Sequence, residues 1–169
     1  MNEPIIKSNI EKGKEVEFHF KQWLDKHNIP YFYIKQEKES FSQALDNSFR
    51  GKRPDFMILI PNLGFILVDT KNRRIHPTYK TYPIDSDETK KYSSVQRRFN
   101  MPIWYVISNE DFDYKTWLWI PVSKVLEEGI PRFNSSKSKE DFYAVPPEEF
   151  TQIADNDSLD RLFTKSFSE

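Results

Sequence analysis

Two short apolar segments separated by a tight turn constrain the fold of this 169-residue chain more than any other feature. Residues 56–60 are all large and apolar, and residues 65–68 are apolar again. Between them lie Pro61 and Gly64, and both residue types favour turns. Both runs are too short for helices and rich in β-branched or aromatic side chains, so they predict two neighbouring β-strands.

Acidic residues flank both predicted strands. Pro54-Asp55 opens the first strand, and Asp69-Thr70-Lys71 closes the second. Asp69 and Lys71 lie two residues apart, so their side chains share one face of a strand. Carboxylate oxygens bind Mg²⁺ or Mn²⁺, and such ions assist phosphodiester hydrolysis. The pattern therefore predicts a nuclease site. The structural alternatives are that Asp55 caps a strand after a turn and that Lys71 only bridges to Asp69.

The charge of the chain is unevenly distributed. The net charge is −1, yet residues 49–100 carry eleven Lys and Arg against five Asp and Glu, a local charge of +6. A polyanion held around a metal centre requires such a local excess, although solvated surface is the plain alternative. The candidate phosphate contacts are Arg73, Arg74, Lys90, Lys91, Arg97 and Arg98.

Length and composition limit the class of protein. A chain of this length predicts a single domain, residues 1–169. The sequence has no apolar stretch long enough to span a bilayer and no signal-like start, so we expect no membrane partner. It contains no cysteine, which suits a reducing cytoplasm and leaves oxygen or histidine ligands for any metal.

Two amphipathic helices are expected around the strands. The first begins near Ser8 and carries a buried stripe at helical spacing. Glu17 lies beside this stripe, whereas Glu15 lies on the outer face, so Glu17 is the acid favoured to reach the sheet edge. The second helix begins near Asp85, and its buried stripe is expected to include Tyr92, Val95 and Phe99.

The order of elements and the motif resemble the PD-(D/E)xK nuclease superfamily, which includes restriction endonucleases and Holliday-junction resolvases. Pro54-Asp55 and Asp69-Thr70-Lys71 carry the resemblance, supported by Gly13, Glu17, Leu24 and Asn28 in the first helix and Gln96 in the second. It covers about residues 9–122 and leaves 123–169 as a C-terminal extension. The implied fold is α/β: a central four- to five-stranded mixed sheet flanked by helices, with the restriction endonuclease-like core order αβββαβ.

The resemblance also implies roles for individual residues. Asp55 and Asp69 would bind Mg²⁺ or Mn²⁺, completed by Glu17 and the backbone carbonyl of Thr70. Lys71 would position the attacking water or stabilise the transition state, and Gln96 would lie beside the metal site. DNA is the implied partner, and many members act as dimers, which leaves a homodimer open.

Two other classes of function compete with a nuclease. The same fold can serve as a catalytically silent nucleic-acid-binding or protein-interaction module. The motif can also be coincidental in an unrelated α/β protein. A geometric test separates these alternatives, because a nuclease requires Asp55, Asp69 and Lys71 to converge.

Overall fold

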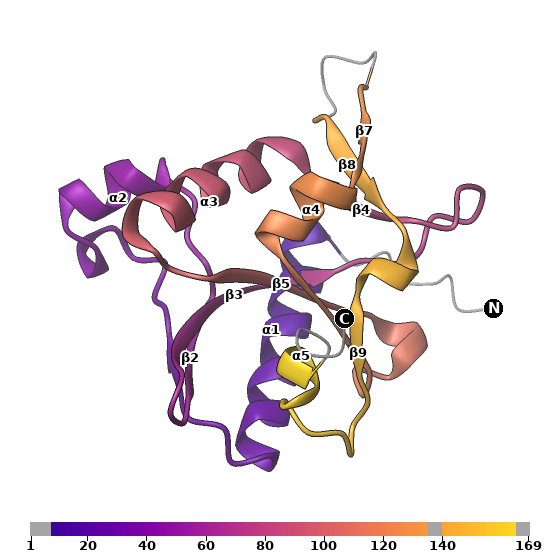
Figure 1. Ribbon diagram of the computed structural model, residues 1–169, viewed down its shortest axis with the longest axis horizontal. Coiled ribbons are helices and arrows are strands. Elements are labelled where there is room, and N and C mark those ends of the chain that lie inside the picture. The colour runs from indigo at the N-terminus through magenta and orange to yellow at the C-terminus, as the bar shows by residue number, and fades with distance from the viewer. Residues whose placement is uncertain (1–7, 135–139, 165–169) are drawn as a thin grey trace.

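The protein is described by a computed structural model that covers residues 8–134 and 140–164. Its main feature is a six-stranded mixed sheet in the order β1-β2-β3-β5-β6-β9 (Figure 1). These strands are β1 (Tyr31–Tyr33), β2 (Phe56–Ile60), β3 (Gly64–Asn72), β5 (Ile103–Ser108), β6 (Trp117–Pro121) and β9 (Thr151–Ile153). The predicted mixed sheet flanked by helices is confirmed, with six strands in place of the expected four or five.

The two apolar runs form the predicted hairpin. β2 and β3 pair antiparallel, with Phe56 opposite Val68 and Ile60 opposite Gly64. β3 then continues past the apolar run through Asn72, because it pairs in parallel with β5 as far as Asn72 opposite Ser108. The motif residues after Val68 therefore lie within the strand and not beyond its end.

The helices cover the two faces of the sheet. The helix α1 (Asn9–Lys26) covers one face, and the helices α2 (Gln43–Phe49), α3 (Ser86–Phe99) and α4 (Val122–Glu128) lie on the other (Figure 1). The core order α1, β1, β2, β3, α3, β5 matches the predicted αβββαβ, with α2 and β4 inserted. No helix in residues 8–134 and 140–164 is long and apolar enough to cross a bilayer.

Local signals explain why α1 lies where it does. The Ser8 hydroxyl accepts a hydrogen bond from the Glu11 backbone N–H, and the Glu11 carboxylate accepts one from the Ser8 N–H, which forms a capping box. The predicted stripe then packs on the sheet, where Phe20 contacts the rings of Phe56, Trp117 and Trp119.

The segment after α4 contributes strands to the main sheet and to a second, smaller sheet. β9 extends the main sheet beyond β6. A second, three-stranded sheet has the order β4-β8-β7, formed by β4 (Tyr82–Asp85), β8 (Phe142–Val145) and β7 (Ile130–Arg132). The short helix α5 (Arg161–Thr164) follows β9.

Candidate active site

Asp55 lies immediately before β2 and is held by the neighbouring strand. Its backbone N–H donates to the Val68 carbonyl at 2.9 Å. Its Oδ2 accepts hydrogen bonds from the Thr70 backbone N–H at 2.8 Å and from the Thr70 hydroxyl at 2.9 Å. Burial and the nearby charge of Glu17 raise the pKa of Asp55 to about 7, despite these bonds and the attraction of Lys71.

Glu17 reaches the same place from α1. Its Oε1 accepts a hydrogen bond from the Tyr33 hydroxyl at 3.0 Å, and its carboxyl interacts with that of Asp55. Burial raises the pKa of Glu17, with a further contribution from the charge of Asp69. Glu17 and Asp55 therefore form a pair of carboxyl groups whose charges repel and which ionise less readily than exposed acids.

Asp69 and Lys71 form a buried ion pair on β3. Lys71 Nζ lies 3.0 Å from Asp69 Oδ1, and Asp69 Oδ2 accepts a hydrogen bond from the Tyr92 hydroxyl. Burial, together with the charges of Glu88 and Asp55, raises the pKa of Asp69 well above its ordinary value, even though Lys71 opposes this. Both carboxylate oxygens of Asp69 are thus occupied by the protein itself.

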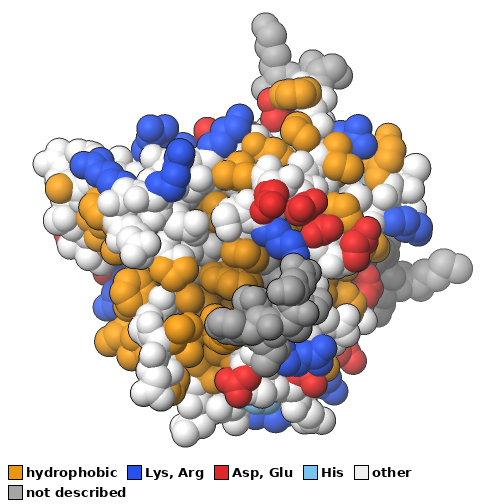
Figure 2. All heavy atoms as spheres, in the orientation of Figure 1, with side chains coloured by type: hydrophobic (Ala, Val, Ile, Leu, Met, Phe, Trp, Pro, Cys, Tyr) orange, Lys and Arg blue, Asp and Glu red, His pale blue; other side chains and the backbone are white. Residues whose placement is uncertain are grey.

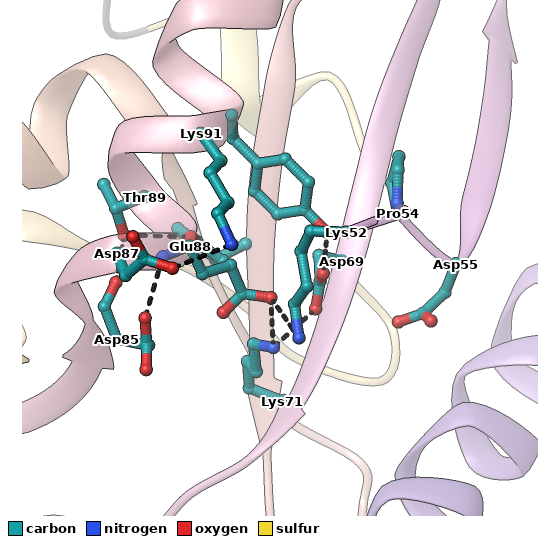
Figure 3. A network of polar contacts seen from close by, with 12 residues as sticks. Lys52, Pro54, Asp55, Asp69, Lys71, Asp85, Asp87, Glu88, Thr89 and Lys91 are labelled. Carbon is teal, nitrogen blue, oxygen red and sulfur yellow. Dashed lines mark hydrogen bonds and ion pairs between the residues drawn. The ribbon is translucent and has the colours of Figure 1, made fainter. Parts of the chain in front are cut away.

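Glu88 is a site residue that the sequence did not reveal. It lies in the first turn of α3, is only 4% exposed, and its Oε1 accepts from Lys71 Nζ at 2.8 Å and from Lys52 Nζ at 3.1 Å (Figure 3). Burial would raise the pKa of Glu88, but the two lysines outweigh it and lower that pKa. Asp85 is the N-cap residue of α3, and its Oδ1 accepts a hydrogen bond from the Glu88 backbone N–H at 2.7 Å. The Glu88 carboxylate binds Lys71.

Lys71 is therefore held by two carboxylates. Burial would lower the pKa of Lys71, but the charges of Asp69 and Glu88 outweigh burial and raise it. Lys71 is fully cationic at neutral pH. Its position is set by β3 and α3 together, because Asp69 and Glu88 come from different elements.

The predicted residues fall into two groups. Lys71 joins Asp69 directly, whereas Asp55 joins Glu17 and Thr70, and Figure 3 shows the Asp55 carboxylate apart from the ion-pair cluster. The groups interact through their charges. Among residues 8–134 and 140–164, no set of three or more acidic or histidine side chains is arranged to hold a metal ion. The expected convergence is present between Asp69 and Lys71 and is incomplete at Asp55.

The donor set nevertheless has the chemistry of a magnesium site. All four buried or half-buried acids offer hard carboxylate oxygens, which Mg²⁺ and Mn²⁺ prefer. Burial raises the pKa values of Glu17 and Asp55, the charges of neighbouring carboxylates add to it, and neither group forms an ion pair among the described residues. A divalent cation would relieve that repulsion, so the residues fit such an ion in charge and ligand type.

A basic pocket lies next to Lys71. Its volume is about 480 Å³, and it lies between the start of α1 and the end of β3, lined by Asn9, Lys12, Gly13, Thr70, Lys71, Asn72 and Arg73. Three of these residues are cationic and none is acidic. A pocket of this kind suits phosphate groups, since Lys and Arg neutralise phosphate charge on binding.

The six predicted phosphate contacts are distributed over different surfaces. Arg73 lines the basic pocket, whereas Arg74 pairs with Glu110 at 3.3 Å and Lys91 pairs with Asp87 at 2.9 Å. Lys90 is exposed on α3, and Figure 2 shows lysine and arginine side chains over this helix and acidic ones over α4. Arg97 and Arg98 lie in the last turn of α3, at the opposite end from Glu88, about 14 Å along the helix axis.

Gln96 connects two elements of the fold. Its Oε1 accepts a hydrogen bond from the Ile103 backbone N–H at 3.0 Å, which ties the end of α3 to the start of β5. Its described contact is therefore structural and lies two turns of α3 away from Glu88. The structure does not place Gln96 with the acidic groups that the resemblance implied.

Comparison with known proteins adds evidence on the fold. No protein-family model and no curated protein sequence matches the chain. A nuclease from a fusselovirus is similar in structure, with a TM-score of 0.50 and 14% identity over 98% of this chain and 99% of that one. A Holliday junction resolvase from the archaeal hyperthermophile Archaeoglobus fulgidus matches with a TM-score of 0.48 and 14% identity, over 79% of this chain and 88% of that one. The likeness to the viral nuclease extends over nearly all of both chains, so the chain has a restriction endonuclease-like fold.

Proposed function

We propose that this protein is a metal-dependent nuclease that hydrolyses phosphodiester bonds of DNA. The observation that carries the proposal is the position of Lys71. It is a half-buried ammonium group held by Asp69 and Glu88, and it borders both the acidic groups and the basic pocket. A phosphate in that pocket would lie beside a fixed cation with carboxylates next to it, which is the arrangement that phosphodiester hydrolysis requires.

Each residue has a role in the proposed reaction. Asp55, Asp69, Glu17 and the Thr70 carbonyl would hold Mg²⁺ or Mn²⁺, and the bound ion would supply Lewis-acid activation of water and of the phosphate. Lys71 orients the nucleophilic water and balances the charge that develops on the phosphate oxygens. Glu88 positions Lys71. Separately, Lys12 and Arg73 bind the flanking phosphates.

The contacts of Asp69 bear on metal binding. Each Asp69 oxygen makes one contact, to Lys71 or to Tyr92, and keeps a second lone pair, so a metal ion can be bound beside these contacts or in exchange for that to Lys71. Lys71 retains Glu88 when this happens, so its ammonium group keeps an anionic partner inside the protein. The second carboxylate thus allows Asp69 to change partners without leaving Lys71 unpaired.

The elements outside the core bear on the substrate. In residues 8–134 and 140–164, the helices outside the core order have at most seven residues and offer little surface for reading a base sequence. We therefore propose a structure-selective or accessory nuclease, in DNA repair, recombination or defence against mobile elements, in preference to a sequence-specific restriction enzyme.

A catalytically silent nucleic-acid-binding or protein-interaction module is the second candidate. The observation that favours it is the full pairing of Asp69 with Lys71 and Tyr92, which leaves no preformed metal site among the described residues. An ion titration separates the two candidates. A nuclease binds Mn²⁺, and its Asp55→Asn variant loses that binding. A silent module binds DNA and no ion.

The decisive experiment is a cleavage assay with supercoiled, linear, single-stranded and branched DNA in Mg²⁺ or Mn²⁺. Lys71→Ala and Asp69→Asn should both lose cleavage while their circular dichroism spectra remain those of the folded protein. Lys26→Ala is the matched control, because that lysine lies in the last turn of α1 and forms a surface ion pair with Asp155. Cleavage that persists in both site variants would trace the activity to a contaminant or another site and refute the proposal.

A further inference from the structure

A second pocket lies away from the acidic groups, on the three-stranded sheet. Its volume is about 510 Å³, and it is lined by His76, Tyr79, Thr81, Pro83, Arg132, Phe133, Asn134, Phe142 and Ala144. The loop between β3 and β4 forms one wall and projects beside β4 (Figure 1). This volume is typical of pockets that hold small ligands.

The lining combines exposed aromatic rings with a cation. Tyr79 is 65% exposed and Phe133 is 81% exposed, although large apolar side chains are usually buried. The Arg132 guanidinium lies 5.7 Å from the centre of the Tyr79 ring. None of the lining residues is acidic. Such a surface is complementary to a flat π-system that carries negative charge.

The loop that presents Tyr79 is ordered by its own hydrogen bonds. His76 Nδ1 accepts from the backbone N–H groups of Thr78 and Tyr79, both at 3.2 Å, and the His76 and Tyr79 rings lie 4.8 Å apart. The His76 backbone N–H donates to the Thr81 carbonyl at 2.8 Å, which closes the loop. Tyr79 is therefore held in a fixed position above the sheet, and little of its freedom remains to be lost on binding.

The same loop connects this pocket to the basic pocket. It begins at Arg73, which lines the basic pocket, and ends at β4, which leads directly into α3 and Glu88. One stretch of chain, residues 73–81, thus connects the two pockets.

We propose that the pocket around Tyr79 and Phe133 binds an unpaired nucleobase of a DNA strand, with the adjacent phosphate at Arg132. The rings stack on the base, and stacking requires no particular base because every base has a π-face. An apolar peptide is the competing occupant, but the cation and the absence of carboxylates in the lining favour a nucleotide. This inference depends on the proposed function only in taking DNA as the ligand.

Binding is tested without cleavage, by fluorescence anisotropy of a labelled oligothymidine and of a blunt duplex of equal length in EDTA. Tyr79→Leu and Phe133→Leu should each weaken single-strand binding by roughly 5- to 150-fold, and Tyr79→Phe should retain it. Arg132→Met should weaken binding and reduce the slope of log K against log salt by roughly 0.7. Phe32→Leu is the matched control, because that ring is 61% exposed on β1, outside the pocket.

The outcomes separate this inference from the nuclease proposal. Wild-type single-strand affinity in both leucine variants overturns the inference, and so does binding of an apolar peptide in place of the oligonucleotide. If no DNA is cleaved under any condition but single-strand binding still requires Tyr79, the nuclease proposal fails and the base-binding pocket stands.

Discussion

The sharpest test of the site concerns stability in the absence of metal. Asp55→Asn keeps the shape of the side chain, and the amide oxygen can still accept from the Thr70 N–H and hydroxyl. The new NH₂ group donates to Glu17 where two carboxyl groups now repel each other. We therefore expect the variant to be more stable than the wild type at pH 8 in EDTA, while it loses stabilisation by Mn²⁺.

The magnitude follows from the raised pKa of Asp55. Its pKa is about 7 in the folded protein, against an ordinary value of 3.8. Because folding favours the protonated form, the stability that Asp55 contributes is fully present below pH 3.8 and is lost as the pH rises through 7. A shift of this size corresponds to at most about 4 kcal/mol. Asp55 is half-buried, so water screens part of this, and we expect a gain of about 2 kcal/mol, or roughly 4–8 °C in Tm.

The assay is thermal and urea denaturation in EDTA between pH 5 and pH 8.5. The gain in stability of Asp55→Asn over the wild type should shrink as the pH falls, because the wild-type Asp55 carboxyl becomes neutral. Asp87→Asn is the control, since Asp87 is exposed and only pairs with Lys91. Mn²⁺ should then stabilise the wild type and not Asp55→Asn. A variant less stable than the wild type at pH 8 in EDTA would show that the Asp55 charge stabilises the fold, and would refute the reasoning.

Three other predictions concern neighbouring residues. Glu88→Gln leaves Lys71 with one carboxylate, so we expect the free energy of unfolding, measured by urea denaturation, to fall by about 3 kcal/mol. Lys52→Met removes a half-exposed partner of Glu88 and should lower it by less than about 1 kcal/mol. Lys12→Ala and Arg73→Ala should each weaken binding of duplex DNA and reduce the slope of log K against log salt by about 1, with folding unchanged. An unaltered slope in these salt titrations would show that the basic pocket is not part of the DNA interface. Arg53 is buried and donates hydrogen bonds to Asp46 and to the carbonyls of Lys35 and Glu37. Arg53→Met should therefore destabilise the protein by about 3 kcal/mol. A change of less than about 0.5 kcal/mol, measured by calorimetry, would contradict this structural role.

The parts of the fold that local signals encode were predictable. The capping residue Ser8 and the stripe of α1 fixed the first helix, and the turn at Pro61 to Gly64 fixed the hairpin of β2 and β3. The pair Asp69 and Lys71 follows from strand alternation alone.

The parts that depend on distant contacts were not predictable from one sequence. Phe99 was expected in the buried stripe of α3, but it is the last residue of the helix, next to the left-handed cap Asn100, and is 40% exposed. Glu88 has no sequence signal that separates it from the exposed acids beside it. It becomes a site residue only because α3 packs so that its first turn meets Lys71 on β3.

The positions of the lysines around the four acids indicate which acids a metal ion would bind most favourably. Asp69 and Glu88 share Lys71, and Glu88 also contacts Lys52, so this side of the site already has cations. Glu17 accepts a hydrogen bond from Tyr33 and Asp55 accepts two from Thr70, and none of the ion pairs seen in the described residues involves either acid. We therefore expect Mn²⁺ affinity, measured by calorimetry, to fall more in Glu17→Gln and Asp55→Asn than in Asp69→Asn. The opposite order would mean that the ion displaces Lys71 from Asp69 first, and that the carboxyl pair is only a structural link between α1 and the sheet.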